Sequence, residues 1–118
     1  MKIGSICEDL SFEKRVSITP EIVKKYKDLG LEVQLVEKYG EHLGFTQHDF
    51  EKQGVKFIKN NKQLIENSDI IIQMGLLEDS NLDFLKPSHT YIGVLNSYIN
   101  IEKLSKLSKQ NINMFSLE

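Results

Sequence analysis

The chain has 118 residues, the size of a single domain. Its 15 basic and 17 acidic side chains give a formal net charge of −2, so we expect no nucleic-acid partner, because nucleic-acid-binding domains are usually basic. The single cysteine, Cys7, excludes an internal disulfide and a zinc site built mainly from thiolates. The longest apolar run, Ile70–Ile72, is far shorter than the roughly 20 residues of a membrane span. The amino terminus lacks the apolar segment of a signal peptide, which favours a cytoplasmic protein.

Short apolar segments alternate with helical segments from the start of the chain. Lys2–Cys7 predicts a first strand. The Thr19-Pro20-Glu21 sequence then predicts a helix start. Threonine caps the first turn, proline fits the first helical position and glutamate complements the helix dipole. Gly30 predicts the end of this helix.

A second helix start is predicted at Thr46. Thr46 and Asp49 are spaced as a capping box, and Phe45 and Phe50 are spaced as a hydrophobic staple around it. Gly54 predicts the end of this short helix. Two independent local signals therefore predict a helix at the same position.

The other elements continue the alternation. The predicted strands are Lys2–Cys7, Leu31–Val36, Val55–Ile58, Asp69–Met74, Thr90–Leu95 and Ile112–Phe115. The later predicted helices are Asn61–Asn67, Ser80–Leu85 and Ile101–Gln110. Short βαβ units of this kind predict an α/β fold with a doubly wound, mainly parallel sheet of about six strands and short helices on both faces. Asp69–Met74 is the most apolar strand, so we expect it to be central and covered on both faces.

Three polar side chains follow predicted strands at the edge where ligands bind open parallel sheets. Arg15, Gln73 and Asn96 follow the first, fourth and fifth strands, and each can hydrogen-bond a carboxylate or amide oxygen. Arg15 is the only arginine and offers a planar, two-pronged donor. We therefore predict that these three residues bind a substrate. The alternative is that Arg15 is a surface arginine paired with Glu13 or Glu8, and that the two amides cap loops.

Other chemistries lack their residues. No G-x-G-x-x-G or Walker sequence occurs, so a dinucleotide would lack its usual pyrophosphate cradle on this chain. His42, His48 and His89 are scattered in sequence, and we expect them to be solvated rather than to bind metal. Cys7 is expected to be a small buried residue and not a nucleophile, because no histidine lies near it in sequence. We therefore predict no catalytic residue and no metal site.

A family resemblance runs through the whole chain. Met1–Gly4, Glu8 and Glu13–Pro20 resemble the opening of alanine dehydrogenases and of the alpha subunit of proton-translocating NAD(P) transhydrogenase. Further segments that follow the family pattern are Leu29–Gly30, Glu32–Val33, Gly40, Gly44–Phe45, Gln53–Val55, Ser68–Ile71, Leu85–Pro87 and Phe115–Glu118.

The departures from the pattern bear on function. The resemblance implies that alanine dehydrogenases hold substrate with an arginine matching Arg15 and a lysine at the position of Gln73, and that their active-site histidine matches Asn96. Without the lysine and the histidine, reductive amination of pyruvate is not expected. The transhydrogenase branch also lacks the histidine, although its alpha subunits usually keep the lysine.

The leading hypothesis from this resemblance is the N-terminal part of a transhydrogenase alpha-subunit-like protein, supporting hydride transfer between NAD(H) and NADP(H) coupled to proton translocation. Residues 1–118 are then a single N-terminal domain, and the NAD-binding Rossmann domain that follows in the family is absent from this chain. NAD(H) and NADP(H) belong to the complete protein, and we expect neither to bind tightly to this chain alone, which should be inactive by itself.

The resemblance also implies partners and a location. The partners are a downstream Rossmann domain or subunit, the transhydrogenase membrane component and, by family analogy, a second copy in a homodimer. The location is cytoplasmic or peripheral to the inner membrane through those partners.

Two other hypotheses remain open. One is a stand-alone module that binds a small acid or a partner, with Arg15 as a carboxylate clamp. Replacement of the family lysine by Gln73 favours it. The other is the N-terminal domain of an alanine or saccharopine dehydrogenase-like enzyme.

Overall fold

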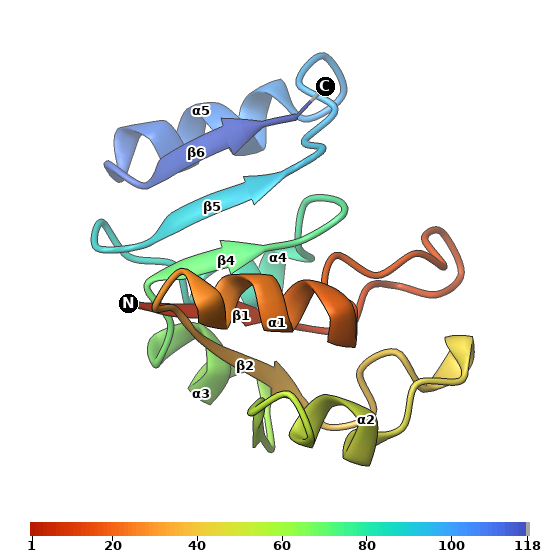
Figure 1. Ribbon diagram of the computed structural model, residues 1–118. Coiled ribbons are helices and arrows are strands. Elements are labelled where there is room, and N and C mark those ends of the chain that lie inside the picture. Colours follow the sequence, from red (N-terminus) through yellow and green to blue (C-terminus); the bar gives the residue numbers. More distant parts are fainter. Residues whose placement is uncertain (118) are drawn as a thin grey trace.

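The computed structural model describes residues 1–117. Its centre is one six-stranded sheet with the order β3-β2-β1-β4-β5-β6, in which every strand pairs in parallel with its neighbours (Figure 1). The strands are β1 (Lys2–Ser5), β2 (Glu32–Val36), β3 (Lys56–Ile58), β4 (Ile70–Ile72), β5 (Thr90–Gly93) and β6 (Asn113–Ser116). The predicted doubly wound α/β class is confirmed.

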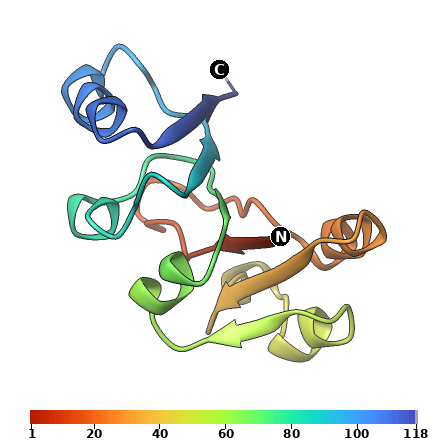
Figure 2. The same cartoon turned by 90° about the vertical axis from the view of Figure 1, so that its left-hand side faces the viewer.

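Helices cover the two faces of the sheet unequally. They are α1 (Pro20–Asp28), α2 (Gln47–Glu51), α3 (Asn61–Glu66), α4 (Asp79–Leu82) and α5 (Ile101–Lys109), with a 3₁₀ turn at Glu41–Leu43. Figure 2 shows α1 and α2 on one face and α3, α4 and α5 on the other. The connecting helices therefore change faces after β3. From the boundary between β1 and β4, the strand order runs one way through β2 and β3 and the other way through β5 and β6. This boundary is the topological switch point, where open α/β sheets bind ligands.

The predicted helix starts are confirmed in detail. The Thr19 hydroxyl accepts a hydrogen bond from the Ile22 amide, and Pro20 occupies the first helical turn of α1. At α2, Thr46 Oγ1 accepts from the Asp49 amide at 3.1 Å while Asp49 Oδ2 accepts from the Thr46 amide at 2.9 Å. Local side-chain chemistry thus fixes where both helices begin.

Gly4 allows α3 to pack closely on β1. A Cβ atom at this position would clash with Ser68 Oγ, just after α3, and would lie 2.9 Å from Cδ2 of Leu64 in α3. Gly4 pairs with Ile71 in β4, so both residues face α3. The tight approach brings β1 and β4 under the same helix, next to the switch point.

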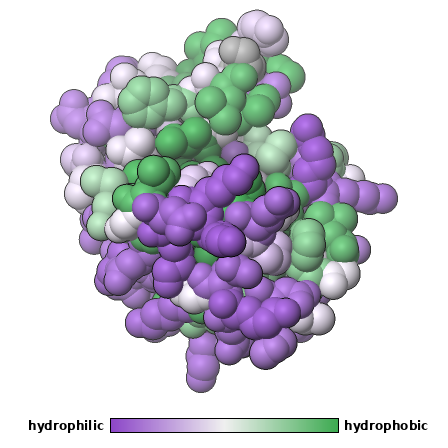
Figure 3. Space-filling view, in the orientation of Figure 1, coloured by the Kyte–Doolittle hydropathy of each residue, from purple (hydrophilic) through white to green (hydrophobic). Residues whose placement is uncertain are grey.

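The face that carries α1 is open over the second half of the sheet. Ile71 is fully buried on the α3 face, but Ile72 and its paired residue Ile92 on the opposite face are only half-buried. Phe115, the next residue across the sheet from Ile92, is 59% exposed. Figure 3 shows hydrophobic side chains gathered over this part of the molecule. The prediction that Asp69–Met74 is covered on both faces is therefore only half correct, because no helix within residues 1–117 lies over this side.

His89 corrects another expectation. It is buried, with 3% of its surface exposed, rather than solvated. Its Nδ1 accepts a hydrogen bond from the Lys86 amide at 2.9 Å, closing a turn before β5. Burial lowers the pKa of His89, so the neutral imidazole is favoured. His42 and His48 are exposed, as predicted.

Candidate functional site

A cavity of about 540 Å³ opens beyond the carboxyl ends of β1, β4 and β5. Its walls come from the segments that follow these strands and from Lys103 of α5. A smaller cavity of about 170 Å³ lies along the same edge, bounded by the end of β1 and the segment after β4. Both cavities share Glu8, Asp9 and residues 76–78, which form the wall common to the two spaces.

Gln73 is held inside the protein rather than presented to a ligand. It is 3% exposed, and its Oε1 accepts from the Ile6 amide at 2.7 Å and from Ser5 Oγ at 2.9 Å. Its Nε2 donates to the Ile6 carbonyl at 3.0 Å and to Glu8 Oε2. The amide therefore joins the end of β4 to the end of β1, and both of its polar atoms are already used.

Glu8 connects Gln73 to the larger cavity, because its carboxylate accepts a hydrogen bond from the Gln73 amide and the residue lines that cavity. Besides the Gln73 amide, its carboxylate accepts from the backbone amides of Met74 and Gly75, each at 3.2 Å. Burial raises the pKa of Glu8. The three donors work against that shift, and the nearby Glu13 adds to it. The carboxylate is thus partly desolvated but well supported by hydrogen bonds.

Arg15 lines the larger cavity and is paired within the chain. Its Nε donates to Glu13 Oε2 at 2.9 Å and its Nη2 donates to Glu13 Oε1 at 2.8 Å. The side chain is 72% exposed. Hydrogen bonds from Arg15 lower the pKa of Glu13 to about 2. The alternative prediction of an Arg15–Glu13 pair is confirmed, and a ligand carboxylate would have to compete with Glu13 for the guanidinium.

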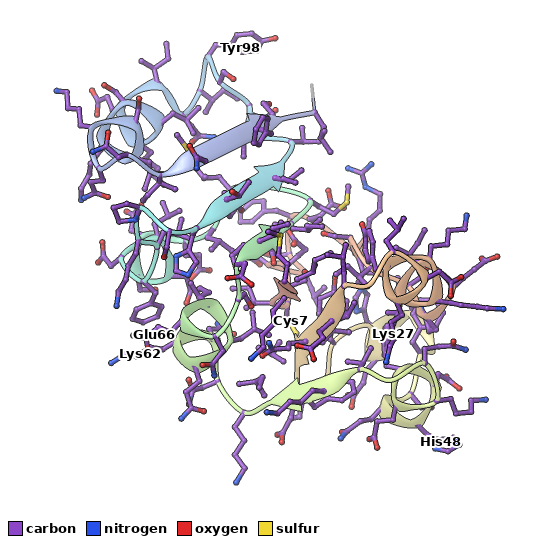
Figure 4. All side chains as sticks on the ribbon, turned by 60° about the vertical axis from the view of Figure 1, so that its left-hand side comes forward. Cys7, Lys27, His48, Lys62, Glu66 and Tyr98 are labelled. Carbon is purple, nitrogen blue, oxygen red and sulfur yellow. The ribbon has the colours of Figure 1, made fainter. Side chains whose placement is uncertain are left out.

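Asn96 shapes the third wall of the larger cavity. It is exposed and has a φ of 49°, a left-handed conformation that asparagine tolerates better than most residues. Its carbonyl accepts from the amides of Ile99 and Asn100, so it turns the chain from β5 toward α5. Figure 4 shows Tyr98 at the outer tip of this loop. Of the three residues expected to converge, Arg15 and Asn96 line one cavity, whereas Gln73 lines the smaller one and lies behind Glu8.

Cys7 is exposed, which corrects the expectation of a buried thiol. It follows β1 at the edge of the sheet and lies among the central strands in Figure 4, with Sγ 3.9 Å from the Glu37 carbonyl oxygen. Partial desolvation, with the carboxylates of Glu41 and Glu8, raises the thiol pKa. A raised pKa lowers the thiolate fraction, so the thiol is a poor nucleophile.

Sequence reasoning did not select Glu8 as a candidate site residue. Glu8 follows the first predicted strand, but the sequence suggested it only as part of the family resemblance and as an alternative partner for Arg15. Its true donors, Gln73, Met74 and Gly75, lie 65 to 67 residues away. The position of Glu8 just after a parallel strand was the available signal.

The arrangement is suited to binding and orientation. Two positively charged side chains, Arg15 and Lys103, line the larger cavity. Lys103 forms an ion pair with Asp79, with 3.1 Å between Nζ and Oδ1. No histidine lines it, and residues 1–117 contain no cluster of three or more metal-ligating side chains. None of the helices in these residues is long and apolar enough to cross a membrane.

The fold defines a doubly wound α/β domain with cavities at the switch point, the place where open sheets of this kind bind ligands. Residues 4–118 match the family described as alanine dehydrogenase/PNT, N-terminal domain, so the chain belongs to this family. The resemblance in the sequence is thereby confirmed.

Individual relatives come from both branches of the family. The first part of the NAD(P) transhydrogenase alpha subunit of Rickettsia prowazekii is 30% identical over 122 residues, covering 100% of this chain and 32% of that protein. Alanine dehydrogenase 1 of Staphylococcus aureus is 26% identical over 118 residues, covering 100% of this chain and 31% of that protein. The chain thus spans about a third of the length of the relatives it matches.

Solved structures agree on the fold. A transhydrogenase from Sinorhizobium meliloti superimposes with a TM-score of 0.90 at 21% identity, covering 98% of this chain and 34% of that one. An L-alanine dehydrogenase gives the same TM-score of 0.90 at 18% identity, covering 98% of this chain and 32% of that one.

Proposed function

We propose that this chain is the N-terminal part of an NAD(P) transhydrogenase alpha subunit-like protein. In the complete protein, hydride passes between NAD(H) and NADP(H), and the transfer is coupled to proton translocation. The observation that carries the proposal is the 30% identity to the Rickettsia transhydrogenase subunit over the whole chain. Gln73 weighs only against the alanine dehydrogenase branch. Its amide is fully engaged with Ser5, Ile6 and Glu8, at a position where the resemblance implies a lysine that polarises a keto oxygen.

In this function the chain positions the cofactor and carries no bond-making residue. The nicotinamide supplies the hydride chemistry when it is bound. The larger cavity, of about 540 Å³, is wide enough for a nicotinamide ring, and its walls offer both acceptors and donors. The chain covers the ring, excludes water and restricts its orientation. It has no glycine fingerprint for the pyrophosphate, so we assign that group to a Rossmann domain elsewhere in the complete protein.

The partners follow from this division of roles. Residues 1–118 are one domain, and a Rossmann domain or subunit supplies the other side of the cleft. A membrane component receives the energy of hydride transfer, so we expect the assembly at the inner membrane, and a second copy makes a homodimer. We expect neither NAD(H) nor NADP(H) to bind tightly to the 118 residues alone.

A hydride-transfer assay tests the proposal. The complete protein with its partner components is given NADH and an NADP⁺ analogue whose reduced form absorbs at its own wavelength, and the 118-residue chain serves as the control. We expect turnover by the complete system and none by the chain alone. Turnover by the 118 residues would refute the positioning role. Reductive amination of pyruvate by the complete protein would instead support the alanine dehydrogenase branch.

A second candidate is a small-acid-binding module, favoured by the exposed Arg15 guanidinium at the cavity. Calorimetric titration of the chain with pyruvate tests it. Arg15→Ala should abolish binding, whereas the neighbouring Lys14→Ala should not. Absence of binding by the unmodified chain would remove this candidate.

A further inference from the structure

The Glu8 carboxylate has no cationic partner among the residues that the structure describes. Within residues 1–117, none of the basic groups lies at ion-pair distance from its carboxylate. Its hydrogen-bond donors are the neutral amides of Gln73, Met74 and Gly75. The half-buried negative charge is therefore fixed in place but not neutralised.

The position of Glu8 suits contact with a ligand. It follows β1 at the switch point, and its carboxylate lines both edge cavities. All three donors come from the segment that follows β4, on one side of the carboxylate. A carboxylate has about four lone-pair sites, so acceptor capacity remains for a group in the cavity.

Gln73 is suited to hold the carboxylate without changing its charge. Its amide makes four hydrogen bonds, three to Ser5 and Ile6 and one to Glu8, so it cannot rotate freely. A lysine at position 73 would place a positive charge beside Glu8 and cancel much of its field. The glutamine keeps the geometry and leaves the negative charge available.

We propose that Glu8 binds the positively charged, oxidised nicotinamide ring, and that Gln73 is the positioning residue that holds Glu8 toward it. This inference rests on the proposed function and specifies how the chain treats the two redox states. The oxidised ring carries a positive charge that the reduced ring lacks, and both carry a carboxamide that can donate a hydrogen bond. A partly desolvated carboxylate therefore favours the oxidised ring by electrostatics, while the hydrogen bond serves both.

The test measures binding of each redox form to the complete protein. Dissociation constants for NAD⁺ and NADH are determined by calorimetry for the unmodified protein and for Glu8→Gln. We expect Glu8→Gln to weaken NAD⁺ binding by about tenfold, in the range of one charge-assisted contact, and to change NADH binding by less than about threefold. Glu37→Gln is the matched control. It removes the same charge from an exposed residue after β2, at the same sheet edge but outside both cavities.

A second variant tests Gln73 without depending on activity. Gln73→Lys should reduce the preference for NAD⁺ much as Glu8→Gln does, because the ammonium neutralises the carboxylate. Circular dichroism establishes that each variant is folded. If Gln73→Lys does not fold, Glu8→Gln decides alone, because Glu8 is at the cavity wall and only half-buried.

The outcomes separate the inference from the proposed function. A complete protein that binds neither NAD⁺ nor NADH would overturn both. Binding of both forms with a ratio that Glu8→Gln leaves unchanged would overturn the role of Glu8 alone. A selective loss of NAD⁺ affinity in Glu8→Gln, absent from Glu37→Gln, supports the inference.

Discussion

The Arg15 guanidinium donates two hydrogen bonds, from Nε and Nη2, to the carboxylate of Glu13, two residues earlier in the chain. The Arg15 backbone amide donates to the same carboxylate at 3.0 Å, so the loop after β1 folds around this pair. A carboxylate from outside must displace an internal one that is always present. The only arginine of the chain is therefore available to a ligand only in competition with its own neighbour.

Removing that competitor should strengthen small-acid binding. In Glu13→Gln the guanidinium loses its ionic partner, so we expect the affinity for pyruvate to rise by about two- to fivefold, a modest gain because exposed ion pairs are weak. Calorimetry on the 118-residue chain measures it, and Glu21→Gln, on the exposed start of α1, is the control. Unchanged or weaker binding in Glu13→Gln would show that Arg15 is not the acid-binding group.

Loss of the Gln73 amide should destabilise the fold. Gln73→Leu leaves the Ile6 amide and carbonyl without their partner in a buried region, and the Ser5 hydroxyl keeps only its hydrogen bond with Tyr39. Buried groups left unpaired cost about 1–3 kcal/mol each before relaxation, so we expect a loss of about 2–4 kcal/mol in the free energy of unfolding. Urea denaturation checks this. Gln63→Leu, at an exposed position on α3, should change stability by less than about 0.5 kcal/mol.

Glu8 should make the fold less stable as pH rises from acid toward neutral. Burial raises its pKa above the ordinary value of 4.5, so the folded state binds this proton more tightly than the unfolded state. The unfolding free energy should then fall as pH rises through the interval just above 4.5. The titratable groups coupled to Glu8 are Glu13, Cys7, Tyr39 and Tyr91.

Comparison with a neutral variant isolates this contribution. From pH 4 to pH 7 the unmodified chain should lose stability relative to Glu8→Gln. The unfolding free energy of the variant minus that of the unmodified chain should therefore increase. Thermal denaturation at a series of pH values measures it. A difference that stays constant, or that shrinks as pH rises, would contradict the raised pKa.

The approach of α3 to β1 should exclude even a methyl group. Gly4→Ala places Cβ against Ser68 and Leu64, and overpacking of this kind costs about 1–3 kcal/mol. Gly75→Ala is the control, because a Cβ there has no neighbour within 4 Å. Equal stability of the two variants in urea would show that α3 can move away from the strand.

Local chemistry explains what the sequence could predict. The starts of α1 and α2 depend on Thr19 and Thr46, whose partners lie three residues away, so spacing alone reveals them. The Arg15–Glu13 pair was foreseeable for the same reason. The doubly wound order followed from the alternation of short strands and helices.

Long-range contacts explain what the sequence could not predict. Gln73 was expected to face a ligand, but its partners Ser5, Ile6 and Glu8 are 65 to 68 residues away. His89 is buried and its ring accepts a hydrogen bond from the Lys86 amide, a feature that the scattered positions of the histidines do not reveal. Such contacts appear only when the strands are placed side by side.

In the described part of the chain, the second half of the sheet is covered by helices on one face only, so the free energy of local opening should fall from the central strands toward β6. β1 and β2 lie between helices on both faces (Figure 2). The face of β5 and β6 that carries the half-buried Ile92 and the exposed Phe115 has no helix over it within residues 1–117, and β6 pairs with a single neighbour. Backbone amides under a single layer open at lower free energy than those enclosed from both sides. Hydrogen exchange of the 118-residue chain should therefore be slowest in β1 and fastest in β6, so that the strands fray from one end of the sheet.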